Sequence, residues 1–393
     1  MKIAFLTAGG IAPCLSSSIG MLINEYYKID KKLEFIGYLH GYKGLLKGNK
    51  VNLEYTNDIE TLCKYGGSIL GNSRVKLTNI DDCIKNGYIK EQEIPLEVAA
   101  HQLIRDKVDV LHTIGGDDTN TTAGDLVEYL GKKNYKLTVV GLPKTIDNDV
   151  TPIKQTLGAV TAAAETSKFF KNIVNENTTS SRQLIIHEVM GRNCGWLTAF
   201  SANLYRESLN EKIFLPSLLL DQNKWDIHAI YIPEDEFNLF EEVVRLRDII
   251  DNVDCVNIFL SEGAGIDNII KEKKANGETI KYDAFGHVRL DEINPGKWYA
   301  DYFSKKLKCD KVLVQKSGYF ARSAAPNVDD LELIHKSSIF AVKQALNKNS
   351  CVVGLTENNQ IEAIDFKKIK GGKEFDINQD WYISMMQEIG QKD

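Results

Sequence analysis

Short apolar runs alternate with helix-like stretches along almost the whole 393-residue chain. The runs KIAFLTA (2–8) and KLTVVGL (136–142) hold neighbouring apolar residues instead of alternating apolar and polar ones. That pattern is typical of strands that are covered on both faces of a sheet. Strand–helix alternation over such a length predicts an α/β protein with mostly parallel sheets.

The length predicts two domains, or three, at roughly 100–200 residues per domain. Helix N-terminal signals include Ser16, expected to be an N-cap, and Pro95, expected just before a helix. The segment 263–310 is polar without a clear strand and is expected to be an insertion. Strands are expected at 2–8, 33–38, 108–116, 136–142, 181–191, 228–232, 256–263 and 351–355. Helices are expected at 16–28, 96–107, 120–133, 156–174, 194–207, 239–251 and 331–346.

Charge and cysteine content exclude several classes of protein. The net charge is -6 and acids and bases are interspersed, which argues against a nucleic-acid binder. Seven cysteines occur singly without a CxxC pair, so a disulfide framework or zinc site is not expected and a reducing cytosol fits. The HEVMG segment at His187 lacks the second histidine of a zinc protease, so a strand is expected there.

The uncharged segment 3–24 near the N-terminus has some resemblance to a signal peptide. Its apolar run is only IAFL, however, and a secretory signal needs about 7–15 apolar residues. Pro13 and three serines argue against a helix that spans a membrane. We therefore expect a first strand and turn, no membrane association, and a cytoplasmic location.

Five unusual loops follow predicted strands directly: 7–14 (TAGGIAPC), 115–123 (GGDDTNTTA), 143–150 (PKTIDNDV), 190–195 (MGRNCG) and 261–265 (SEGAG). In open α/β sheets ligands bind outside the carboxyl ends of the strands. Five such loops therefore predict a binding site.

Two glycine pairs, Gly9-Gly10 and Gly115-Gly116, point to phosphate as a ligand. Glycine lets backbone N–H groups approach an anion, and each pair precedes a helix whose N-terminus favours negative charge. The chain has neither the GxxxxGK(S/T) pattern of P-loop proteins nor GxGxxG of dinucleotide-binding proteins. Simple tight turns are the alternative interpretation of the same glycines.

Three aspartates, Asp117, Asp147 and Asp149, are expected to converge on the phosphates. Carboxylates repel phosphate unless a cation lies between them, and Mg²⁺ is usually held by few protein ligands. A carboxylate free of metal can take a hydroxyl proton in phosphoryl transfer. The alternative is that Asp147 and Asn148 only form a turn and that Asp117 caps a helix.

Taken together, these motifs resemble those of the phosphofructokinase family, and specifically its pyrophosphate-dependent branch. GGDDT, PKTIDND, MGRNCGWLTA and GYFARS occur in family order, and with TAGGIAPC and LGNSR they span 7–323. The resemblance implies reversible Mg²⁺-dependent phosphoryl transfer from pyrophosphate to the 1-hydroxyl of fructose 6-phosphate. The products are fructose 1,6-bisphosphate and phosphate.

The resemblance also implies a fold of two Rossmann-like α/β/α sandwich domains with the active site in the cleft between them. The phosphoryl-donor domain is expected at 1–158 plus about 322–368. The fructose 6-phosphate domain is expected at 159–321 plus about 369–393. A homodimer or homotetramer is expected, with Arg182 or a neighbour crossing between subunits.

Roles on the donor side follow from the family motifs. Asp147 resembles the base that accepts the proton of the sugar hydroxyl. Thr145 is expected to hold the transferred group or the sugar, and Asp117 and Asp149 are expected to bind Mg²⁺ directly or through water. Gly10 is expected to offer its backbone N–H to the phosphates.

The remaining residues implied by the family offset charge or bind the sugar phosphate. Arg74, in LGNSR, resembles the arginine that stabilises the transferring group, together with Lys144. The set expected to bind the sugar phosphate is Met190, Gly191, Arg192, Glu262, Lys316, Tyr319 and Arg322.

Two substitutions within these motifs favour pyrophosphate as the donor. ATP-dependent relatives read GGDGS and PGTIDND, where this chain has Asp118 and Lys144 in place of glycines. Asp118 adds negative charge where a nucleotide α-phosphate would lie, and Lys144 adds a cation suited to free pyrophosphate. Both substitutions therefore argue against ATP.

The chain departs from the family in its first loop, where Cys14 and Ser16 replace glycine and asparagine. Gly20 and Asn24 replace two effector-binding arginines, so that allosteric site is not expected. Alternatives to the pyrophosphate-dependent enzyme are an ATP-dependent 6-phosphofructokinase, a lipid or NAD kinase, and a non-catalytic sugar-phosphate sensor. Lipid and NAD kinases lack the MGR and GYFARS motifs, and a sensor would be expected to lose Asp147 or Asp117.

Overall fold

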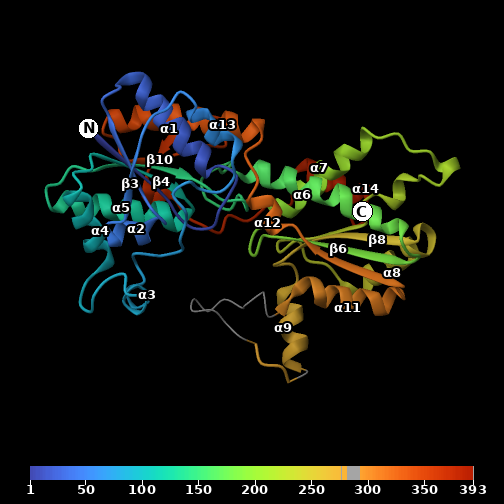
Figure 1. Cartoon of the computed structure of the whole chain (residues 1–393). Coiled ribbons are helices and arrows are strands. Elements are labelled where there is room, and N and C mark those ends of the chain that lie inside the picture. The colour runs from blue at the N-terminus through green and yellow to red at the C-terminus, as the bar shows by residue number, and fades with distance from the viewer. Residues whose placement is uncertain (276, 281–292, 393) are drawn as a thin grey trace. The chain divides into compact units, whose positions relative to one another are not determined.

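The computed structural model (Figure 1) describes residues 1–275, 277–280 and 293–392. It divides into two compact units. Unit 1 comprises Met1–Ala162 and Arg322–Lys373, and unit 2 comprises Ala163–Ala321 and Glu374–Asp393. Each unit has its own sheet and its own hydrophobic core.

Unit 1 contains a seven-stranded sheet with the order β11-β10-β5-β4-β1-β2-β3. Only the two edge strands, β3 and β11, run antiparallel to their neighbours. The strands are β1 (Lys2–Thr7), β2 (Glu34–Tyr38), β3 (Lys50–Leu53), β4 (Val110–Gly115), β5 (Thr138–Pro143), β10 (Cys351–Leu355) and β11 (Ile361–Ile364). The helices are α1 (Leu15–Ile29), α2 (Tyr42–Lys47), α3 (Ile80–Lys85), α4 (Pro95–Arg105), α5 (Asp117–Lys132) and α13 (Val328–Leu346), and the start of α6 (Ala159–Ile173).

The three central strands of this sheet bring the predicted loops together. β5, β4 and β1 are direct parallel neighbours, and all three are almost fully buried. Their carboxyl ends therefore lie at one edge, so the loops after Thr7, Gly115 and Pro143 are adjacent. The core consequently determines where the charged residues of these loops meet.

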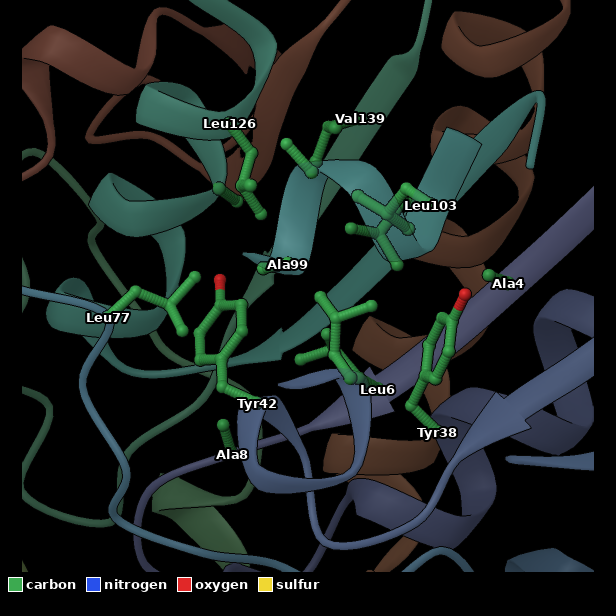
Figure 2. Close-up of a cluster of buried hydrophobic side chains, with 14 of the residues drawn as sticks. Ala4, Leu6, Ala8, Tyr38, Tyr42, Leu77, Ala99, Leu103, Leu126 and Val139 are labelled. Carbon is green, nitrogen blue, oxygen red and sulfur yellow. The ribbon is translucent and has the colours of Figure 1, made fainter. Parts of the chain in front are cut away.

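Helices cover both faces of the unit 1 sheet: α1 packs with α13 on one face, and α2, α4 and α5 lie on the other (Figure 1). Figure 2 shows the core under the second face, with Leu6 and Tyr42 facing Ala99 and Leu77. The buried hydroxyl of Tyr42 donates a hydrogen bond of 2.7 Å to the carbonyl of Thr119. This core residue thus supports the first turn of α5.

Unit 2 contains a four-stranded, fully parallel sheet with the order β7-β8-β6-β9. Its strands are β6 (Gln183–Val189), β7 (Ala229–Tyr231), β8 (Cys255–Ser261) and β9 (Lys311–Lys316). Its helices are the rest of α6, α7 (Trp196–Asn210), α8 (Leu239–Val253), α9 (Ile266–Ala275), α11 (Pro295–Leu307), α12 (Gly318–Arg322), which ends in unit 1, and α14 (Asp380–Glu388). Because β8, β6 and β9 are neighbours, the loops after Ser261, Val189 and Lys316 also share one edge.

His187 lies inside β6, as the strand interpretation of HEVMG predicted. Its ring is fully buried and packs among Phe169, Phe170 and Phe259. Burial lowers the pKa of this histidine to about 3, so it stays neutral at physiological pH. It is a core residue of unit 2.

The predicted α/β class with mostly parallel sheets is confirmed, but several local predictions were wrong. Cys14 precedes α1 as its cap residue, and the Ser16 hydroxyl donates instead to the carbonyl of Gly67 at 2.9 Å. Pro95 is the first residue of α4 rather than the residue before it. Strands β3, β9 and β11 were missed because they are short or partly exposed at sheet edges.

The segment expected to be a strandless insertion, 263–310, contains α9 and α11 among its described residues, and 276 and 281–292 lie outside them. In the part of the chain that the structure describes, no helix is both long and apolar enough to cross a membrane.

Candidate active site

The first loop of unit 1 follows β1 and is tied to residues 72–74. The backbone N–H of Gly9, whose φ is 83°, donates to the carbonyl of Ser73 at 2.9 Å. The side-chain amide of Asn72 donates to the carbonyls of Gly9 and Gly10 at 3.2 and 3.3 Å. A side chain at Gly10 would place its Cβ 3.9 Å from an Arg74 guanidinium nitrogen. Gly10 and Arg74 are therefore neighbours.

Lys144 directly follows β5 and is almost fully buried. Its ammonium group donates to the carbonyl of Gly10 at 2.5 Å. Burial lowers the pKa of Lys144, while the nearby Cys14, Asp147 and Asp149 act in the opposite direction. The lysine thus brings a positive charge into the loop that contains the candidate base.

The loop 145–156 is folded around its own polar side chains. Asn148 has a left-handed φ of 55°, and its buried side chain accepts from the Thr156 N–H at 2.9 Å and donates to the Lys154 carbonyl at 3.0 Å. The Thr156 hydroxyl donates to the Thr145 carbonyl at 2.9 Å. The backbone bends at residues 146–147, next to the position expected for a turn, and this bend presents Asp147 and Asp149.

Thr145 links the two aspartates of this loop. Its hydroxyl accepts the Asp147 N–H at 3.1 Å and donates to the Asp149 carboxylate. Burial raises the pKa of the Asp149 carboxyl, and the negative charge of Asp117 raises it further. Asp117, in the first turn of α5, is therefore close enough to Asp149 for the two carboxylates to repel each other.

Asp118 points differently from its neighbour. Its side chain is 59% exposed and forms an ion pair of 2.5 Å with Lys76. The first loop, Lys144, the 145–156 loop and Asp117 thus come together, whereas Asp118 faces a cation that the sequence did not single out.

In unit 2 the loop after β6 is held by close backbone contacts. Gly191 has a φ of 127°, and a Cβ there would lie 2.4 Å from the carbonyl oxygen of Cys194. The Ser261 hydroxyl donates to the Gly191 carbonyl at 2.5 Å. A Cβ at Gly263 would lie 1.8 Å from the Arg192 carbonyl oxygen. The loops after β6 and β8 therefore pack directly on each other.

Glu262 begins the loop after β8, and its N–H donates to the Val189 carbonyl at 2.9 Å. Burial raises the pKa of its carboxyl, and a hydrogen bond from the Gly191 backbone acts in the opposite direction. The charges of Arg192 and Lys316 also lower that pKa. The structure thus brings Glu262, Gly191, Arg192 and Lys316 to one edge of the unit 2 sheet.

Lys316 ends β9 and is engaged by a carboxylate that the sequence analysis missed. Its ammonium group lies 2.7 Å from Glu188, which is 6% exposed and also accepts the Gly296 N–H at 2.9 Å. The helix α12 follows, and a Cβ at Gly318 would lie 2.7 Å from the Met190 sulfur. Tyr319, the next residue, is 80% exposed.

Arg182 lies at the opposite edge of the unit 2 sheet, because it precedes β6 while Met190 follows it. Its guanidinium pairs with Asp251 at 2.6 Å and donates to the carbonyls of Lys308 and Leu307. Its contacts are therefore inside its own unit, and its crossing between subunits stays a prediction.

A cavity of about 1040 Å³ opens beside Arg192 in unit 2. Its lining includes Glu234, Asp235 and Glu236. Carboxylates repel a phosphate that has no cation between, so this lining suits a sugar phosphate poorly. The cavity also contains none of the other residues predicted to bind the sugar.

Metal-binding potential is limited to pairs of carboxylates. Over residues 1–275, 277–280 and 293–392, no group of three or more His, Cys, Asp and Glu side chains is arranged to hold a metal. Mg²⁺ is nevertheless often held by one or two carboxylates, with water and substrate phosphates as its other ligands. Asp117 and Asp149 fit that requirement because each carries charge that a cation would relieve.

The chain matches the family model described as Phosphofructokinase over residues 2–345. It is 54% identical over 394 residues to the pyrophosphate–fructose 6-phosphate 1-phosphotransferase of Methylomonas methanica, covering 99% of this chain and 96% of that protein. It is 51% identical over 396 residues to the protein of the same name from Propionibacterium freudenreichii, covering 99% of this chain and 98% of that one.

The fold is also similar to that of solved structures. The pyrophosphate-dependent phosphofructokinase of Marinobacter aquaeolei matches with a TM-score of 0.72 and 20% sequence identity. The match covers 97% of this chain and 88% of that one. At this identity the likeness concerns the two-domain α/β fold alone.

Proposed function

The chain belongs to the phosphofructokinase family, and we propose that it transfers a phosphoryl group reversibly between pyrophosphate and the 1-hydroxyl of fructose 6-phosphate. The forward reaction gives fructose 1,6-bisphosphate and phosphate. Relatives that share half of its residues over their full length carry the name of this activity.

The observation that carries the proposal within the chain itself is the position of Lys144. ATP-dependent relatives have glycine at this point of the motif, and here a buried ammonium group lies beside Asp147, Asp149 and Gly10. A buried cation attracts a small, highly charged anion more strongly than an exposed cation does, because the effective dielectric around it is lower than in water. Pyrophosphate is such an anion.

We propose that Asp147 takes the proton of the sugar 1-hydroxyl as its oxygen attacks one phosphorus of pyrophosphate. A new O–P bond forms, the bridging P–O bond breaks, and its electron pair leaves with phosphate. Arg74 and Lys144 offset the charge on the transferring group, and the N–H of Gly10 binds a phosphate oxygen. Such positioned charges carry most of the catalysis in phosphoryl transfer.

We infer that Asp117 and Asp149 hold Mg²⁺, directly or through water. Support comes from the raised pKa of Asp149, which results from burial and from the charge of Asp117. These two residues would hold the ion, and the ion would supply positive charge that offsets the negative charge of the reacting phosphates.

The proposal assigns the donor to unit 1 and the sugar phosphate to unit 2. Glu262 would accept sugar hydroxyls, and Met190, Gly191 and Arg192 would bind the sugar phosphate. Lys316, Tyr319 and Arg322 would bind its 6-phosphate. The supporting observation is that the unit 2 members gather at one sheet edge, after β6, β8 and β9.

A coupled assay with fructose 6-phosphate, Mg²⁺ and either pyrophosphate or ATP tests the function directly. We expect turnover with pyrophosphate in both directions and at most weak turnover with ATP. Folded protein that turns over neither donor would refute the activity, and a preference for ATP would make the ATP-dependent alternative correct.

We also propose a cytoplasmic enzyme that works as a homodimer or homotetramer. All seven cysteines are free, which fits a reducing compartment. The oligomer is suggested by the family, in which we expect an arginine such as Arg182 to reach a second subunit. Sedimentation that finds a fully active monomer would contradict this part of the proposal.

A further inference from the structure

Residues 370–373 (KGGK), which we call the C-terminal strap, return to the 145–156 loop from far along the chain. The Thr151 N–H donates to the Lys370 carbonyl at 2.8 Å, and the Lys370 N–H donates to the Thr151 carbonyl at 3.1 Å. The Lys373 N–H donates to the Asp149 carbonyl at 2.8 Å. The strap is therefore bonded to the backbone of the loop that carries Asp149.

The Lys373 side chain adds a second connection. Its ammonium group donates to the carbonyl of Ile153 at 2.5 Å and to that of Lys154 at 3.3 Å. One lysine thus closes the loop from Asp149 to Lys154 with both its backbone and its side chain.

Gly371 connects the strap to the other carboxylate. A Cβ at Gly371 would lie 2.1 Å from a carboxylate oxygen of Asp117 and 2.7 Å from its Cγ. Gly371 is not among the glycines with positive φ, so its backbone conformation suits any residue. A side chain at position 371 would therefore force the Asp117 carboxylate to shift.

The next residue provides the contrast. Gly372 has a left-handed φ of 76°, but a Cβ there would meet no atom within 4 Å. Gly372 therefore suits its position because its backbone is left-handed, whereas Gly371 suits its position because of its contact with the Asp117 carboxylate.

We propose that the strap sets the spacing of Asp117 and Asp149, so that Gly371 and Lys373 are positioning residues for the Mg²⁺–pyrophosphate subsite. Asp117 and Asp149 come from different loops and repel each other, and the strap touches the side chain of one and the backbone of the other. This inference rests on the proposed function, because it assumes that the two carboxylates hold the metal.

The test compares Gly371→Ala with Gly372→Asn, a matched control because asparagine tolerates the left-handed conformation. Mn²⁺ is the probe, and its binding in the presence of pyrophosphate is measured by electron paramagnetic resonance. We expect Gly371→Ala to weaken Mn²⁺ binding at least tenfold, and Gly372→Asn to stay within twofold of wild type. In turnover assays, Gly371→Ala should raise the KM for pyrophosphate and leave the KM for fructose 6-phosphate unchanged.

A second measurement depends on neither metal nor activity. Gly371→Ala should lower the Tm, and the same change made in an Asp117→Ala protein should lower it much less, because the colliding carboxylate is gone. Equal losses of Tm in both backgrounds, unchanged Mn²⁺ binding by Gly371→Ala, or a wild type that binds no Mn²⁺ with pyrophosphate would each overturn the proposal.

The two proposals fail in different ways. If wild type turns over pyrophosphate and Gly371→Ala behaves like wild type, the strap has no positioning role and the function stands. If wild type binds Mn²⁺ with pyrophosphate but catalyses nothing, the function is wrong, and the Mn²⁺ and Tm comparisons still decide the role of the strap.

Discussion

In unit 1 the loops at the sheet edge are braced by side chains. Asn72 fixes the first loop, while Asn148, Thr156 and Lys373 hold the loop that carries the two aspartates. In unit 2 the corresponding loops are held mainly by backbone packed against backbone, at Gly191 and Gly263, with one bond from the Ser261 hydroxyl. Charged side chains at the unit 2 edge, such as Lys316, are more exposed than Lys144 at the unit 1 edge.

This difference predicts different roles in the reaction for the two sheet edges, one in unit 1 and one in unit 2. Braced carboxylates and a buried lysine keep their geometry before the substrate arrives, which favours stabilisation of a transition state. Exposed cations on backbone-held loops can adjust to an incoming ligand and supply binding. Substitutions of Asp147 and the other charged residues of unit 1 should therefore act mainly on kcat, and those of the charged residues of unit 2 mainly on the KM for fructose 6-phosphate.

The largest effect is expected from Asp147→Ser in unit 1. Loss of a general base typically lowers the rate by about 10²–10⁴. Asp147 lies in a loop rather than the core, so we expect the free energy of unfolding to change by less than about 1 kcal/mol. Steady-state kinetics and thermal denaturation measure both quantities. A kcat within threefold of wild type would show that another group is the base.

Lys144→Gly should come next. A charge-assisted hydrogen bond is worth roughly 1.5–3 kcal/mol, so kcat/KM for pyrophosphate should fall by about 10–150-fold. ATP use should not appear, since Asp118 remains. Measuring kcat/KM for both donors decides the point, and retention of full pyrophosphate activity would remove Lys144 from the donor site.

Lys316→Met tests the unit 2 side. We expect the KM for fructose 6-phosphate to rise about tenfold, which corresponds to about 1.4 kcal/mol, while kcat stays within twofold. Lys311→Met is a matched control, because Lys311 lies at the other end of the same strand and contacts Glu176 and Thr179. A fall in kcat with KM unchanged would contradict the different roles predicted for the two sheet edges.

Asp118→Gly should change donor choice by a factor similar to that of Lys316→Met. Two like charges 4 Å apart repel by about 4 kcal/mol at an effective dielectric near 20, but Asp118 is 59% exposed and paired with Lys76. We therefore expect kcat/KM for ATP to rise by about tenfold, which corresponds to about 1.4 kcal/mol. Lys76→Met, which removes that pairing, should lower ATP use instead. Undetectable ATP use by Asp118→Gly with unchanged pyrophosphate use would contradict the role of Asp118.

The smallest effect expected is on stability. Burial raises the pKa of Asp149, so the folded protein binds more protons than the unfolded chain and loses stability as pH rises through that pKa. Without Mg²⁺ at neutral pH, Asp149→Asn should therefore raise the Tm by about 1–3 °C, given roughly 2–4 °C per kcal/mol. The gain should vanish at acidic pH, where Asp149 is protonated in wild type too. A lower Tm for Asp149→Asn than for wild type at neutral pH would contradict the expected direction of the stability change.

Much of the fold could be predicted from the sequence, because the central strands are continuous apolar runs. Such runs are accommodated only in a sheet that is covered by helices on both faces. The edge strands were not predicted, because β3 is mostly exposed and β9 is only partly buried. A strand of that kind depends on its neighbour rather than on its own apolar residues.

The candidate site shows the same limit. Loops after neighbouring strands were expected to meet, and Lys144 does contact Gly10 while Asp149 lies near Asp117. Lys76, Glu188 and Gly371 were missed, because each acts through a contact that only the folded chain creates. The amino-acid sequence of the KGGK segment carries no sign of its contact with Asp117.

The pairing of β5 with β10 has a consequence for how the protein is made. β5 lies inside the finished sheet, yet its neighbour begins at Cys351, roughly 200 residues after Pro143, and a ribosome takes about 10–40 s to add them at 5–20 residues per second. During that interval the nascent chain has an apolar strand edge without its final neighbour, which can pair with other chains. The same delay applies to the strap, so the 145–156 loop is braced only after residues 370–373 have been added.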